Sequence, residues 1–261
     1  MMNVLIPGSL DEAVMHYRKD PQHTRYLAGG TQVNRLGRSQ SLYQGVLISS
    51  LVDADIIRED KRLTIGAGAT LQDLVDHAQV PESLKRACLF AQSRTLRCMA
   101  TVGGNIASVR DDSYLLPLLG ALNGEVQFHD GESMALDIYL GERREPSGSI
   151  ITRVVIPDCT IPVFLERASR SSQTKPALTV ACSLGDQFRV YCSAAGQFMR
   201  RLQEVEQLAE QSADDQRIIS LVQRTIHPAD DITGTGRYKQ YLAGVLIAQG
   251  LQELKGKRKE V

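Results

Sequence analysis

Two segments that each pair adjacent glycines with small polar residues constrain this chain more than any other feature of its sequence. The first reads LAGGTQ over residues 27–32, and the second reads TVGGNI over residues 101–106. Glycine adopts positive φ at no steric cost, brings the backbone close to a ligand and can offer its N–H group to a phosphate oxygen. One such segment alone is usually only a turn. Because two matched copies occur, we expect both to close on one diphosphate.

We call these stretches the first and second glycine segments. Their members are the predicted ligand contacts: Leu27, Ala28, Gly29, Gly30, Thr31 and Gln32 in the first, and Thr101, Val102, Gly103, Gly104, Asn105 and Ile106 in the second.

Other nucleotide-binding patterns are incomplete in this sequence. Gly66 and Gly68 follow an expected strand, but Leu71 stands where the dinucleotide motif GxGxxG needs its third glycine. The phosphate-binding pattern GxxxxGK[ST] does not occur, so the sequence gives no support for ATP hydrolysis of that type.

Charge and cysteine usage exclude several classes of function. The 30 basic residues balance the 30 acidic ones, which argues against a nucleic-acid or anionic-membrane partner. The five cysteines form no CxxC pair, so we expect no metal site and reduced, packed thiols, Cys98 among them. No run of eighteen apolar residues and no signal-peptide pattern is present, which predicts a cytoplasmic protein without a transmembrane helix.

No catalytic residue can be assigned from the pattern. None of the five histidines stands beside a nucleophile or carboxylate in a recognisable spacing. The adjacent pair Asp111 and Asp112 most simply starts a helix before Leu115, where negative charge is favourable. Arg94 and Arg97 are expected to guide a phosphate, to line a subunit face or to form a solvated helix end.

The hydrophobic pattern predicts a mixed α+β protein. We expect helices over 9–18, 115–122, 201–225 and 238–254, and two further helices that begin at Thr70 and at Pro81. We expect one strand that ends at Leu27 and others over 45–49, 62–68, 124–129, 150–156, 164–170, 177–184 and 187–193. Ser9 and Glu12 are placed to cap the first helix, and a polar loop is expected over 141–149. Composition changes near 53 and Pro157 divide the chain into 1–53, 54–158 and 159–261.

Taken together, these stretches resemble the FAD-binding (medium) subunit of the molybdenum hydroxylases, the family of xanthine dehydrogenase and aerobic carbon monoxide dehydrogenase. That family carries an AGGT and a TxGGN segment, which stand here at 28–31 and 101–105. The landmarks LTIGA at 63–67, RTLR at 94–97, ITRVVIP at 151–157 and YKQYLAGVL at 238–246 occur in the family's order.

The resemblance implies a vanillyl-alcohol-oxidase-type FAD fold in two subdomains, followed by a C-terminal domain with a three-stranded antiparallel sheet and helices. It implies that FAD receives electrons from an iron–sulfur subunit, which takes them from a molybdopterin subunit, and passes them to NAD or another acceptor. The flavin then carries the redox chemistry of this oxidoreductase subunit, which agrees with the missing catalytic constellation.

Three positions depart from the family pattern. The acidic position after the second glycine segment falls on Tyr114 without a gap, although Asp111 or Asp112 can reach the same place, so all three are predicted FAD contacts. Gln32 replaces a frequent Asp, and Glu166 occupies the region of a flavin-contacting Lys. Two alternatives therefore stay open: a stand-alone FAD-dependent reductase or oxidase, and a scaffold subunit that keeps the fold without cofactor.

Overall fold

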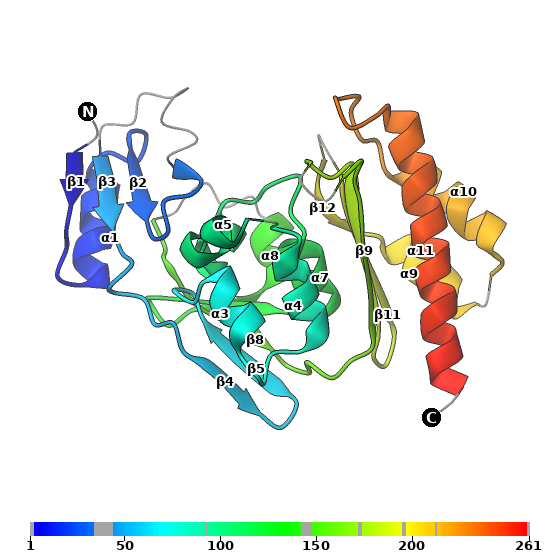
Figure 1. Ribbon diagram of the computed structural model, residues 1–261, viewed down its shortest axis with the longest axis horizontal. Helices are drawn as coiled ribbons and strands as arrows, with labels where there is room; N and C mark the ends of the chain where they lie inside the picture. Colours follow the sequence, from blue (N-terminus) through cyan, green and yellow to red (C-terminus); the bar gives the residue numbers. More distant parts are fainter. Residues whose placement is uncertain are drawn as a thin grey trace. The chain divides into compact units, whose positions relative to one another are not determined.

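The computed structural model describes residues 3–33, 44–91, 93–141, 148–171, 174–194, 197–211 and 213–259 (Figure 1). These residues form two compact units that do not follow the chain order. Unit 1 contains residues 1–80, 93–108 and 125–156, and unit 2 contains residues 81–92, 109–124 and 157–261. Unit 1 ends at Ile156, beside the expected boundary at Pro157. Residues 81–92 and 109–124, which were expected in the middle domain, belong to unit 2 instead. The three-part division stays a prediction.

Unit 1 begins with a small parallel sheet. Its strands lie in the order β1 (Asn3–Leu5), β3 (Gln44–Leu47), β2 (Thr24–Leu27), and helix α1 (Leu10–Lys19) connects β1 to β2. The Ser9 side chain accepts from the backbone N–H of Glu12, as the capping pattern predicts, and the Glu12 carboxylate accepts from the N–H of Gly8. Buried Ala13 and Val14 pack with the sheet, because they lie on one side of the helix.

The second sheet of unit 1 is antiparallel. Its strands follow the order β4 (Ile56–Glu59), β5 (Arg62–Gly66), β8 (Ile151–Ile156), β6 (Glu125–Phe128), β7 (Ser133–Ala135). Short helices α3 (Leu71–Asp76), α5 (Arg94–Met99), α6 (Val102–Ala107) and α8 (Leu136–Gly141) accompany it. The expected polar loop over 141–149 lies mostly outside the described residues.

Unit 2 is built on an antiparallel sheet with both faces covered. Its order is β12 (Gln197–Arg201), β11 (Phe188–Ala194), β10 (Leu178–Leu184), β9 (Val163–Ala168). Helices α9 (Gln203–Glu210), α10 (Asp215–Thr225) and α11 (Gly236–Lys259) pack on one face (Figure 1). Helix α7 (Leu115–Ala121) contacts β10 and β11, and α4 (Glu82–Leu89) contacts α7. Every residue of β10 is buried, as a strand between two layers requires.

One expectation for this region was wrong, and another was correct only in part. The described sheet has four strands instead of three, because β12 adds to the edge of β11. The expected helix over 201–225 is two helices; Arg201 ends β12, and its guanidinium pairs with Glu206 at 3.0 Å. Buried Glu206 also accepts from the N–H of Val190, so this ion pair joins α9 to the sheet.

Close packing of α11 predicts how two of its glycines respond to substitution. A Cβ on Gly250 would lie 2.4 Å from the Phe164 ring, whereas a Cβ on Gly256 would meet no atom within 4 Å. Gly250→Ala is therefore expected to lower the free energy of unfolding by about 1–3 kcal/mol. In the same helix, Gly256→Ala should raise it by up to about 1 kcal/mol, because alanine favours helix. Urea denaturation of both variants checks this, and equal effects would contradict the packing.

Candidate functional site

Both glycine segments belong to unit 1, and the backbone of the first lies against the residues that lead into the second. A Cβ on Gly29 would lie 1.6 Å from the Met99 carbonyl oxygen and 3.4 Å from Cα of Ala100. No side chain can occupy that space. Gly29 is thus required for the approach that brings the two segments together.

The first segment presents backbone donors. Gly30 has φ of +67°, a conformation that favours glycine. Within the described part of the chain, the N–H groups of Gly29, Gly30 and Thr31 donate no hydrogen bond. Three successive free N–H groups around a positive φ match the donor set that binds phosphate oxygens.

The second segment differs from the expected glycine turn, because it is the start of a helix. Thr101 caps α6 by accepting from the N–H of Gly104, and Gly103 and Gly104 have helical φ. The N–H groups of Val102 and Gly103 donate to the carbonyls of Ala69 and Ala67. The expectation that these glycines offer free N–H groups was therefore wrong at this segment.

Glycine at 103 serves close packing instead. A Cβ there would lie 2.6 Å from the Cβ of Ala67, so the helix could not approach the chain that follows β5. Gly104 is exposed, and the half-buried Asn105 side-chain amide makes no hydrogen bond to any described residue. Exposed backbone and this amide are what the second segment presents to a ligand.

Three apolar members of the two segments have buried side chains. Leu27, Val102 and Ile106 are part of the core, so only their backbone atoms can contact a ligand. Thr70 and Thr101 form an isolated antiparallel bridge that ties the start of α3 to the start of α6. The second segment is therefore fixed from two sides.

Arg97 is structural. Its side chain is buried, and its Nε donates to Oε1 of Gln72 at 2.9 Å, which joins α5 to α3. A solvated helix end is therefore excluded for this arginine, while Arg94 is exposed. Cys98 is exposed instead of packed, so the expectation for its thiol was wrong.

The predicted contacts after the second segment lie in unit 2 and have protein partners there. Arg110 donates to Asp112 from Nε at 2.6 Å and from a second guanidinium nitrogen. The Asp111 carboxylate lies 3.9 Å from Nζ of Lys175, and its carbonyl accepts from the Ser193 hydroxyl at 2.8 Å. These contacts fix the segment against the unit 2 sheet.

The Ser113 side chain satisfies a backbone N–H in the first turn of helix α7. Ser113 Oγ accepts from the N–H of Leu116 at 3.2 Å, whereas the carboxylates of Asp111 and Asp112 pair elsewhere. Tyr114 packs edge-on against Phe90, with ring centroids 6.2 Å apart. Burial raises the pKa of the Tyr114 phenol to about 12. A phenol, which is neutral at physiological pH, therefore stands at the position where the resemblance implies an acid.

Sequence reasoning missed the charged cluster around Lys175. Nζ of Lys175 lies 3.9 Å from Asp231, which accepts from the fully buried Lys239 at 2.7 Å. Burial alone would raise the pKa of the Asp231 carboxyl, but hydrogen bonds from Lys239 and Thr233 outweigh it and hold that pKa well below its usual range.

Over the described residues, no group of histidine, cysteine and acidic side chains could hold a metal ion. None of the helices described is long and apolar enough to cross a membrane. The features that fit a ligand are the three free N–H groups of the first segment, the glycine-dependent contact to Met99 and the Asn105 amide. Together they suit a diphosphate approached by backbone.

Comparison with known proteins places the chain in a family. Residues 1–159 match the family described as the FAD binding domain in molybdopterin dehydrogenase. The protein YgfM of Escherichia coli K12, described as uncharacterized, is 29% identical over 244 residues, covering 93% of this chain and 92% of YgfM.

Solved structures share the fold over nearly the whole length. Reconstituted carbon monoxide dehydrogenase from Oligotropha carboxidovorans gives a TM-score of 0.85 at 19% identity, covering 98% of both chains. Quinoline 2-oxidoreductase from Pseudomonas putida 86 gives 0.82 at 17% identity, covering 97% of this chain and 96% of the other. Because the family match covers more than half of this chain, the chain belongs to the FAD-binding domain family of the molybdopterin dehydrogenases and is a flavoprotein.

Proposed function

We propose that this chain is the electron-transfer subunit of a molybdenum hydroxylase-like complex, passing electrons from an iron–sulfur partner through FAD to an acceptor. The observation that carries the proposal is the pair of glycine segments held together at Gly29, with free N–H groups on the first. The family match and the fold shared with the carbon monoxide dehydrogenase and quinoline 2-oxidoreductase structures support it.

In this proposal the chain holds and orients its cofactor. The N–H groups of Gly29, Gly30 and Thr31 donate to the diphosphate, whose charge is met by backbone instead of cationic side chains. The Asn105 amide supplies a further hydrogen bond. FAD, when bound, supplies the electron-transfer chemistry, so the chain needs no acid–base or nucleophilic residue of its own.

Partners are required by the chemistry that this chain lacks. The sequence has five scattered cysteines without a CxxC pair, and the described residues contain no metal-ligand cluster. We propose that the iron–sulfur and molybdopterin centres are held by other subunits. We also propose a cytoplasmic location and keep Gln32, Asp111, Asp112 and Tyr114 as candidate FAD contacts.

Asn105 gives a test of cofactor binding that leaves the fold intact. Its amide has no described protein partner, so Asn105→Ala should weaken FAD binding about fivefold through one lost hydrogen bond without changing the melting temperature of the cofactor-free chain. Quenching of flavin fluorescence gives the dissociation constant. Asn3→Ala, at an exposed position of β1, is the matched control. An unchanged dissociation constant in Asn105→Ala would remove this residue from the site.

Purification of the tagged full chain from its native cells tests the proposed role. We expect bound FAD together with iron and molybdenum in co-purifying subunits, measured by released flavin and elemental analysis. A lone chain that holds FAD and turns over NAD(P)H with a small acceptor would instead establish the stand-alone reductase. A complex in which this chain holds no FAD would establish the scaffold.

A further inference from the structure

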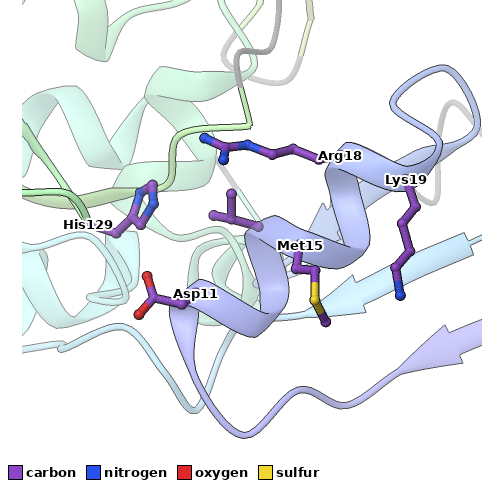
Figure 2. A pocket seen from close by; sticks show the side chains of 6 residues that line it. Asp11, Met15, Arg18, Lys19 and His129 are labelled. Atoms are coloured by element: carbon purple, nitrogen blue, oxygen red, sulfur yellow. The ribbon is translucent and has the colours of Figure 1, made fainter.

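A hollow of about 430 Å³ lies in unit 1 beside helix α1, apart from both glycine segments. It is lined by Asp11, Val14, Met15, Arg18, Lys19 and His129 (Figure 2). His129 follows β6, so the hollow is formed by segments more than 100 residues apart in the sequence. Figure 2 shows Asp11 and Arg18 extending from α1 toward the side where His129 lies, with the imidazole between the two charged ends in this view.

The charged groups of this hollow do not neutralise each other. Asp11, Val14 and Arg18 follow the i, i+3, i+7 spacing, which places them on one face of α1. Seven residues of helix separate the ends of this stripe by about 10 Å, too far for an ordinary ion pair along the face. Accordingly, the side chains of Asp11 and Arg18 make no hydrogen bond or ion pair with any other described residue.

His129 adds a donor of fixed identity. Its Nδ1 accepts from the backbone N–H of Ile150 at 3.2 Å, and the backbone N–H of His129 donates to the Ile150 carbonyl at 3.0 Å. An imidazole that accepts at Nδ1 carries its hydrogen on Nε2 when neutral. The hollow therefore has an Nε2–H donor, a guanidinium and, at the other end, a carboxylate.

A second hollow, in unit 2, shows the contrast. It is larger, about 750 Å³, but several of its polar groups already have partners: Arg258 lies 3.4 Å from Glu210, and Asp215 accepts from the neutral amide of Gln252 at 2.6 Å. Those contacts leave few polar groups that a ligand could bind. The hollow beside α1 differs because its polar groups are separated and available.

We propose that the hollow beside α1 binds a small amino-carboxylate zwitterion, such as a free amino acid with an apolar side chain. The planar guanidinium of Arg18 and Nε2–H of His129 suit a carboxylate, and Asp11 suits an ammonium group. Asp11 also disfavours a phosphate dianion, and the buried Val14 with Met15 gives an apolar wall for the side chain. This inference is independent of the proposed electron-transfer role.

Calorimetric titration of the FAD-loaded full chain tests the proposal with three matched probes. L-leucine carries both charges, N-acetyl-L-leucine lacks the ammonium group, and L-leucinamide lacks the carboxylate. We expect millimolar binding of L-leucine, because the hollow is open, and at least about tenfold weaker binding of both analogues and of inorganic phosphate. Equal binding of phosphate or of either analogue, or no binding of L-leucine, would overturn the proposal.

Two variants locate the binding. Arg18→Gln should weaken L-leucine binding at least about tenfold, and Asp11→Asn should remove the preference over N-acetyl-L-leucine. Arg62→Gln, at an exposed position of β5, is the matched control and should leave binding unchanged. Flavin absorbance reports separately that the cofactor is retained in every variant. Binding of L-leucine that neither variant changes would place the ligand elsewhere and refute the assignment.

Discussion

The close backbone contact between Gly29 and Met99 is the constraint on which the site in unit 1 depends. A methyl group at position 29 would overlap the Met99 carbonyl oxygen, so any residue other than glycine would separate the two segments. Gly103 approaches Ala67, and Gly66 approaches Asp53, in the same way: a Cβ on either glycine would overlap the neighbouring residue. Backbone therefore packs directly on backbone along this part of unit 1. A site built in this way needs no excess of positive side chains, in agreement with the balanced charge of the chain.

The two glycine segments reach this arrangement by different means. The first leaves its N–H groups free around a positive φ at Gly30. The second forms the start of α6, and its N–H groups donate hydrogen bonds to the carbonyls of Ala67 and Ala69 and to the Thr101 side chain. Under the proposed function, the first segment would be the source of backbone donors, while the second would supply a fixed surface and the Asn105 amide. Similar sequence patterns thus perform complementary tasks.

Unit 2 holds its segment before α7 by long-range polar contacts. Ser193 on β11 donates to the Asp111 carbonyl, and Lys175 connects the carboxylates of Asp111 and Asp231. Asp231 is in turn held by the fully buried Lys239. A buried lysine is tolerated only with such partners, so the start of α11 is fixed to the turn that precedes it. Tyr114 and Glu166, where the sequence departs from the pattern that the resemblance implies, have local partners: Tyr114 packs against Phe90, and Glu166 pairs with Arg86 at 2.6 Å.

The sequence by itself determined the features that depend on neighbouring residues. Ser9 and Thr70 cap their helices where the capping pattern predicts, the strands at 62–66 and 178–184 follow their apolar patterns, and the ordered motifs identified the family. Tertiary structure alone decided the helical state of Gly103, the burial of Arg97, the exposure of Cys98 and the fourth strand of the unit 2 sheet. Each of these depends on partners distant in the chain, such as Ala67 for Gly103 and Gln72 for Arg97. Capping and periodicity are encoded over a few residues, whereas close approach and burial exist only after distant segments have packed.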